Sequence, residues 1–178
     1  MNDKNRQKIT ALDCAYIATF VALVIAVQLA LSFVPGVELV TVLFITFSFA
    51  FGAKRGMIAA VAFALLRQFV FGVFPTVLIL YLIYFPLLAL LFGALGRRVR
   101  PSVKNLIWLT IVACVCTVGF SLLDCVITPL WYAYTAAATR AYFYGSLSFM
   151  IPQVVCTAVS VALLFLPLTK VFSWAHKR

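Results

Sequence analysis

Long apolar runs alternate along the chain with short breaks that hold glycine, proline and basic residues. A helix that spans a bilayer needs about 20 apolar residues, and six runs approach or exceed that length. They cover residues 9–33, 38–53, 56–74, 77–96, 105–131 and 145–169. Turn-forming residues close some of them, such as Pro35 with Gly36 after the first run and Pro75 after the third. The pattern predicts an all-α, polytopic membrane protein in which residues 1–178 form one domain, with six transmembrane helices and one longer loop at 132–144.

Twelve of the fourteen basic residues fall on alternate breaks between these runs or at the two ends of the chain. They are Lys4, Arg6, Lys8, Lys54, Arg55, Arg97, Arg98, Arg100, Lys104, Lys170, Lys177 and Arg178. The other two differ, because Arg140 lies in an opposite break and Arg67 lies inside a run. Cytoplasmic loops of membrane proteins carry an excess of Lys and Arg. The distribution therefore predicts a cell-membrane protein with both termini in the cytoplasm.

Composition agrees with a membrane location. The chain is 66% hydrophobic and 10% charged, whereas soluble domains carry about 45–50% apolar and about 25% charged residues. The net charge of +10 is explained by orientation and by contact with lipid headgroups, so it requires no nucleic-acid partner. The first run is longer than the apolar part of a signal peptide, which is usually about 7–15 residues, and is expected to be a retained span.

Motifs for catalysis are absent from the sequence. It contains no H-E-x-x-H, no G-x-S-x-G and no nucleotide-binding G-x-x-x-x-G-K-[ST]. Asp13 is expected near the inner face and Glu38 and Asp124 near the outer one, each on a different helix, so no acid–base pair or metal site is predicted. The five cysteines form no C-x-x-C pair and are expected to be small buried side chains. We therefore predict neither an enzyme nor a bound cofactor.

The informative residues are polar groups within apolar runs. A charged side chain in a spanning helix costs about 2.5–3.5 kcal/mol and usually faces a cavity or a partner. Arg67, followed by Gln68, is expected at or beyond the middle of the membrane, and Asp124 and Glu38 are expected in the outer half. These residues predict a small-molecule site open to the exterior. The alternative is a structural ion pair between Arg67 and one of the two acids.

Aromatic residues cluster around the outer loop. Trp131 and Tyr132 precede Arg140, and further tyrosines follow it. These residues are candidates for the aromatic walls of the same site, with Arg140 as a polar contact. The alternative interpretation is an aromatic belt at the membrane surface.

Alanine recurs every fourth residue in the first run, at Ala18, Ala22, Ala26 and Ala30. A smooth face of this kind lets another helix approach closely. It predicts either internal packing or a docking face for a partner membrane protein.

The chain resembles the substrate-binding S component of energy-coupling factor (ECF) transporters over essentially its whole length. The resemblance rests on the six spans with both ends inside, the alanine row, the sequence Val-Pro-Gly-Val-Glu-Leu-Val-Thr at 34–41, and the segment 51–72 that ends in Leu-Arg-Gln-Phe-Val-Phe-Gly. It implies a subunit that captures a vitamin or a related precursor at the outer surface and delivers it inward. It further implies a transmembrane coupling subunit, which the alanine row would face, and two cytoplasmic ABC-type ATPases. The family handles riboflavin, thiamine, biotin, folate, pantothenate and cobalamin, and the resemblance selects none of these.

Two other classes compete with this interpretation. A stand-alone secondary transporter or small channel is the main alternative, although the two halves of the chain show no convincing similarity. A membrane enzyme or assembly factor is disfavoured by the missing motifs.

Overall fold

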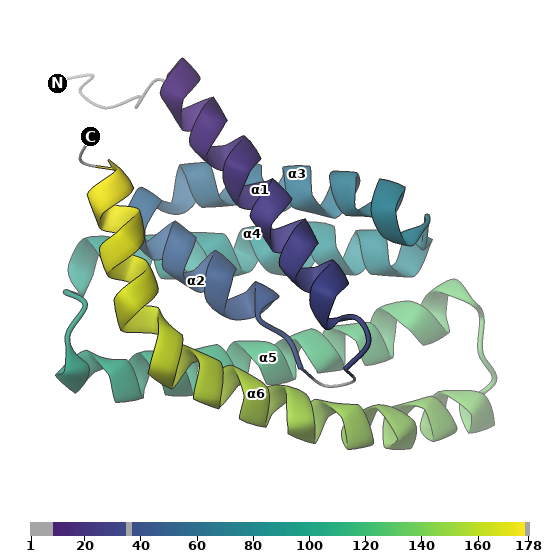
Figure 1. Cartoon of the computed structure of the whole chain (residues 1–178). Helices are drawn as coiled ribbons and strands as arrows, with labels where there is room; N and C mark the ends of the chain where they lie inside the picture. Colours follow the sequence, from purple (N-terminus) through teal and green to yellow (C-terminus); the bar gives the residue numbers. More distant parts are fainter. Residues whose placement is uncertain (1–8, 35–36, 177–178) are drawn as a thin grey trace, which may run out of the picture.

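The computed structural model describes residues 9–34 and 37–176. These residues form six helices and no strand. In chain order the helices are α1 (Ala11–Leu31), α2 (Val40–Phe51), α3 (Ala53–Phe71), α4 (Pro75–Arg98), α5 (Val103–Trp131) and α6 (Ala136–His176) (Figure 1). The predicted all-α architecture is confirmed. The proposed turn at Pro35 and Gly36 lies outside the described residues.

Four of the helices, α1, α4, α5 and α6, are long and apolar enough to cross a membrane. Their length and composition support the prediction of a helical membrane protein. Helix α2 is apolar but has only 12 residues, which is about 18 Å at about 1.5 Å per residue. Helix α3 is continuous, but its sequence contains three charged residues, Lys54, Arg55 and Arg67. By length and composition alone, therefore, α2 and α3 do not qualify as spans.

The predicted loop at 132–144 is wrong over most of its length. Helix α6 begins at Ala136 and continues for 41 residues, so that only a short turn separates it from α5. Thr135 starts the helix by accepting a hydrogen bond from the backbone N–H of Ala138. The alanines that follow have the highest helix propensity of any residue. The loop was expected because the segment lies between the apolar runs 105–131 and 145–169.

Helix α2 is the centre of the bundle. Eleven of its twelve residues are buried, and it contacts α1, α3, α4, α5 and α6. Phenylalanine rings join these helices: Phe20 of α1 stacks on Phe47 with centroids 4.0 Å apart, and Phe44 lies 4.7 Å from Phe85 of α4. A short helix buried on all sides is uniformly apolar, and this explains why α2 looks like a span in the sequence.

Glycines allow α4 to approach the turn between α2 and α3. Gly52 forms that turn with a positive φ of 90°. A Cβ at Gly93 would lie 2.2 Å from the backbone nitrogen of Ala53, and one at Gly96 would lie 2.3 Å from the carbonyl oxygen of Phe49. These distances are too short for any side chain, so both glycines are required by the packing.

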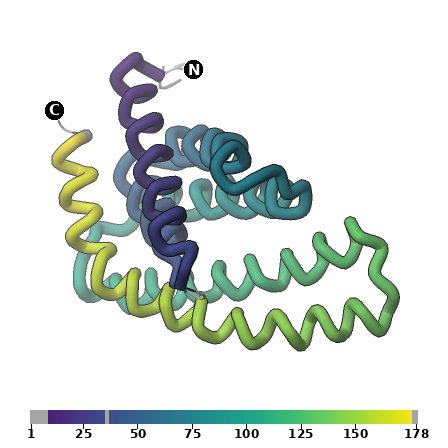
Figure 2. Tube along the Cα trace, turned by 45° about the vertical axis from the view of Figure 1, so that its right-hand side comes forward, coloured from purple at the N-terminus to yellow at the C-terminus, as the bar shows by residue number. Residues whose placement is uncertain are grey.

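Helices α5 and α6 form a long hairpin that extends away from the other helices (Figures 1 and 2). Threonine hydroxyls of Thr117 and Thr157 lie 3.1 Å apart where the two helices meet, and both side chains are buried. Helix α6 contains Pro152 and Pro167 and is visibly bent. A proline inside a helix removes a backbone hydrogen bond and favours such a bend.

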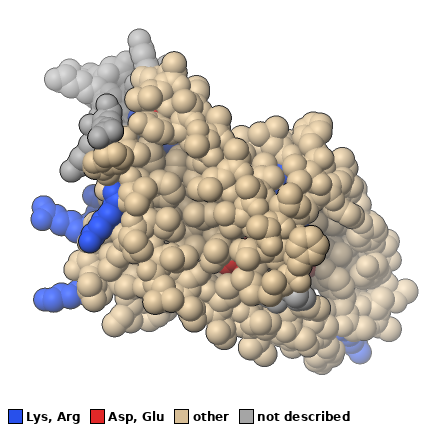
Figure 3. Space-filling model, in the orientation of Figure 1, with Lys and Arg blue, Asp and Glu red and all other residues tan. Residues whose placement is uncertain are grey.

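The described basic residues other than Arg67 and Arg140 lie towards one end of the bundle. Most of the Lys and Arg side chains visible in Figure 3 lie at one edge, where α4 meets α5 and where α6 ends in Figure 1. Of the twelve residues assigned to the cytoplasmic side, Lys4, Arg6, Lys8, Lys177 and Arg178 lie outside the described residues.

The cysteine prediction is wrong. Cys14 is exposed on α1, and the other four cysteines are only partly buried. In a membrane protein the outer surface is itself apolar, so a small apolar side chain gains little from burial inside the bundle.

Candidate functional site

A cavity of about 420 Å³ lies beside the ends of α1 and α3. Both helices run towards it from the basic end of the bundle (Figure 1). Two of the predicted site residues, Glu38 and Arg67, line it together. The remaining walls come from all helices and from the α1–α2 connection; they are Gln28, Leu31, Ser32, Val34, Val37, Leu39, Val40, Phe71, Tyr81, Phe120, Phe149 and Gln153.

Arg67 is held firmly in the wall of this cavity. Its guanidinium carbon lies 4.7 Å from the ring centre of Phe71 and 4.9 Å from that of Tyr81, which is the distance of a cation–π contact. Its Nε donates to Oε1 of Gln28 over 3.1 Å, and Gln28 in turn donates to the Tyr81 hydroxyl. Its Nη1 is buried and has no hydrogen-bond partner among the described residues. The side chain is thus oriented by the protein but left with an unused donor.

Glu38 stands on a different wall, just before α2. Its Oε2 accepts a 2.5 Å hydrogen bond from Nε2 of Gln153 on α6, and its backbone N–H lies 3.3 Å from Sγ of Cys156. Within the described chain Glu38 forms no ion pair with Arg67. The predicted alternative, in which Arg67 pairs directly with an acid, is therefore wrong for both Glu38 and Asp124. The side chains of Arg67 and Glu38 therefore line one cavity without forming an ion pair.

Asp124 lines a second cavity of about 400 Å³ between α5 and α6. The two cavities adjoin, because Phe120, Phe149 and Gln153 line both. Both oxygens of Asp124 are already satisfied: Oδ1 accepts from the Thr128 hydroxyl over 2.8 Å and Oδ2 from the Tyr142 hydroxyl over 2.7 Å. Both carboxylate oxygens of Asp124 thus have a protein donor, whereas Nη1 of Arg67 has no acceptor among the described residues.

The other predicted site residues do not line either cavity. Gln68 is buried and points into the α3–α4 turn, where its Oε1 accepts from the backbone N–H of Phe74 and replaces a missing turn hydrogen bond. Trp131, Tyr132 and Arg140 are exposed at the far tip of the α5–α6 hairpin. Because α6 begins as early as Ala136, it places these residues away from the bundle. Their predicted depth in the membrane was therefore not enough to predict that they lie near Arg67 and Glu38.

The alanine row of α1 is exposed. Ala18, Ala22, Ala26 and Ala30 face outward, while α1 buries a different stripe against the bundle. That buried stripe consists of Asp13, Ile17, Phe20, Val21 and Val24. Internal packing therefore does not explain the row.

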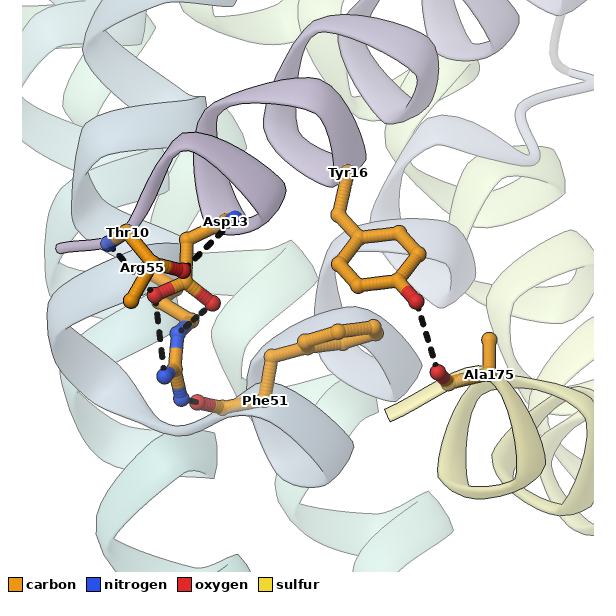
Figure 4. Close-up of polar contacts among 6 residues, drawn as sticks. All are labelled: Thr10, Asp13, Tyr16, Phe51, Arg55 and Ala175. Atoms are coloured by element: carbon orange, nitrogen blue, oxygen red, sulfur yellow. Dashed lines mark hydrogen bonds and ion pairs between the residues drawn. The ribbon is translucent and has the colours of Figure 1, made fainter. Parts of the chain in front are cut away.

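A second polar cluster ties α1 to α3 at the basic end (Figure 4). Asp13 closes a capping box with Thr10 at the start of α1 and forms a 2.7 Å ion pair with Nε of Arg55. Arg55 also donates to the carbonyl oxygen of Phe51, and nearby the Tyr16 hydroxyl donates to that of Ala175 on α6. The sequence contains the signal for this cap, a threonine three residues before an acid, although we did not predict a capping box from it.

The residues that sequence reasoning missed are uncharged. Gln28, Tyr81 and Gln153 make the hydrogen bonds that position Arg67 and Glu38. Gln28 and Gln153 carry a usable signal, because each is an amide within an otherwise apolar stretch. Among the described residues no three His, Cys, Asp or Glu side chains gather in a group that would hold a metal ion.

Comparison of the chain with known protein families, curated proteins and solved structures finds no match.

Proposed function

We propose that this protein is the substrate-binding S component of an ECF-type ABC importer, which captures a vitamin or related precursor at the outer face of the cell membrane. The observation that carries the proposal is the cavity between Arg67 and Glu38. A buried, oriented guanidinium with an unused Nη1 donor costs free energy unless something supplies an acceptor. A bound small molecule supplies it.

The proposed orientation has six helices in the membrane and both termini in the cytoplasm. The clustering of basic residues at one end supports it, since that end would face the cytoplasm. The cavity then lies on the opposite side, because α1 and α3 begin at the basic end and finish at the cavity. Helix α2, too short to span alone, is surrounded by its neighbours and is accommodated in the interior of the bundle.

The proposed partners are a transmembrane coupling subunit and two ABC-type ATPases, together with membrane lipid. The exposed alanine row of α1 supports a helical partner, because small side chains let two helices approach closely in a bilayer. The chain has no nucleotide-binding motif of its own, so ATP-driven uptake requires ATP hydrolysis in another subunit.

Co-purification tests this proposal. The affinity-tagged chain, expressed in the cells from which it comes, is expected to retain a coupling subunit and two ATPases that are identified by mass spectrometry. Replacing both Ala22 and Ala26 by leucine is expected to release these partners and leave the fold intact, since both side chains are exposed.

The matched control is Leu23→Phe, which enlarges an exposed side chain of the same helix outside the row. It is expected to keep the partners. Recovery of the chain alone, combined with transport by the purified chain in liposomes, would instead identify a stand-alone secondary transporter and overturn the proposal.

A further inference from the structure

The cavity presents one positive and one negative wall. Arg67 contributes a guanidinium whose Nη1 lacks a partner among the described residues, and Glu38 contributes a carboxylate held by Gln153. These two side chains line the same space without forming an ion pair. The lining therefore carries no net charge, although it contains two separated charges of opposite sign.

Separated charges in a poorly solvated cavity favour a particular kind of ligand. A ligand with one charge would pair with one wall and leave the other wall desolvated and uncompensated, which is strongly unfavourable. A ligand with both charges compensates both walls. A carboxylate matches the planar N–H donors of Arg67, and an ammonium group matches the carboxylate of Glu38.

The adjoining cavity adds apolar space for the rest of the ligand. Its carboxylate, Asp124, accepts hydrogen bonds from the hydroxyls of Thr128 and Tyr142, so that each of its oxygens has a protein donor before a ligand binds. Phe120 and Phe149 line both cavities. Aromatic side chains stack favourably on ring compounds, so the ring of a ligand anchored at Arg67 and Glu38 would lie against these two residues.

We propose, resting on the proposed function, that the substrate is a ring compound that is zwitterionic and has no net charge. Its carboxylate binds Arg67, its ammonium group binds Glu38, and its ring lies against Phe120 and Phe149. Gln153 positions the carboxylate of Glu38 and so contributes to recognition of the positive end.

A panel of probes with the same ring and different charges tests this proposal. L-Tryptophan carries both charges, tryptamine lacks the carboxylate and indole-3-propionate lacks the ammonium group; L-tyrosine and L-phenylalanine serve as further zwitterions. Titration calorimetry on the full chain in detergent is expected to show that L-tryptophan or another zwitterion binds at least about tenfold more tightly than either singly charged analogue. This factor reflects the loss of one hydrogen bond to a charged group.

Two substitutions assign the charges to the walls. With Glu38→Gln the preference for L-tryptophan over indole-3-propionate is expected to fall to near unity, and with Arg67→Gln the same is expected for the preference over tryptamine. Arg67→Lys, which keeps the charge, is expected to retain part of that preference. The control Arg140→Gln removes an exposed arginine outside both cavities and is expected to leave all affinities unchanged.

The proposal is overturned if a singly charged analogue binds the unaltered protein as tightly as the zwitterions, or if none of the zwitterions binds. In either case the proposed function still stands when the coupling subunit and ATPases co-purify. Conversely, zwitterion binding by a chain that recovers no partners would support the ligand class and overturn the ECF assignment.

Discussion

Nε of Arg67 on α3 and Oε1 of Gln28 on α1 are joined by a hydrogen bond of 3.1 Å. Gln28 also donates to the hydroxyl of Tyr81, whose ring lies against the same guanidinium. Residues of three helices thus hold the guanidinium in place. Gln28 is a positioning residue, since its amide orients the arginine rather than supplying the charge that a ligand would meet.

Gln28→Leu tests this relationship. Without the amide, the guanidinium loses its acceptor at Nε and becomes free to turn out of the cavity. The affinity for the best-binding probe is expected to fall by about tenfold to a hundredfold, the range for a hydrogen bond to a charged group, with little change in helical content. Titration calorimetry and circular dichroism measure the two effects. Thr19→Val, at an exposed position on the same helix, is the control; equal affinities in both variants would contradict the role of Gln28.

The Asp13–Arg55 ion pair is expected to stabilise the basic end of the bundle. Arg55→Gln leaves the carboxylate of Asp13 with the Thr10 cap but without its cation, which costs about 1 kcal/mol for a pair near the surface of the bundle. The free energy of unfolding, measured by titration with a denaturing detergent, is expected to fall by that amount. Lys104→Gln removes an exposed positive charge from the same end of the bundle and is expected to have no measurable effect.

A double-mutant cycle separates this pair from other effects of the substitutions. Asp13→Asn combined with Arg55→Gln is expected to be clearly less destabilising than the sum of the two single changes, because each single change leaves one charge unpaired and the double change leaves none. Strict additivity would show that the ion pair contributes nothing.

Gly93→Ala is expected to destabilise the fold by about 2 kcal/mol, within the range for overpacking. The new Cβ would lie 2.2 Å from the backbone nitrogen of Ala53, so that α4 and the α2–α3 turn must separate. Gly119→Ala is the matched control, because nothing lies within 4 Å of a Cβ at that position. The shift in thermal unfolding temperature of the detergent-solubilised protein measures both. Equal stability of the two variants would show that the helices do not pack as described.

The proposed orientation predicts which positions are accessible from outside the cell. A cysteine at position 140 is expected to react with a membrane-impermeant maleimide in intact cells, and a cysteine at position 104 only after the membrane is opened. The unsubstituted chain, with its five cysteines, gives the background. Labelling of position 104 in intact cells would contradict the orientation.

The sequence predicted where the helices lie better than it predicted which of them are enclosed by other helices. Apolar runs located all six, since burial in the bundle and burial in lipid select the same residues. For that reason hydrophobicity could not distinguish α2, which is enclosed by other helices, from a helix that faces lipid. The start of α6 was missed because the sixth apolar run begins only at Gly145, whereas the helix already begins at Ala136.

The candidate site was predicted in part. The cost of a charge in an apolar run singled out Arg67 and Glu38, and the structure places both in one cavity. The same argument gave no sign that Asp124 is satisfied by Thr128 and Tyr142. That distinction depends on hydrogen bonds from the next turn of α5 and from α6, which the predicted depth in the membrane does not reveal.

Mass spectrometry of small molecules released from the purified protein tests the central claim most directly. The protein is prepared unaltered, as Arg67→Gln and as Arg140→Gln, and each preparation is denatured and extracted. We expect one compound to be released in near-equal amount from the unaltered protein and from Arg140→Gln, and to be strongly depleted from Arg67→Gln. Release of the same compound in equal amount from all three preparations would contradict the assignment of the cavity beside Arg67 as the binding site.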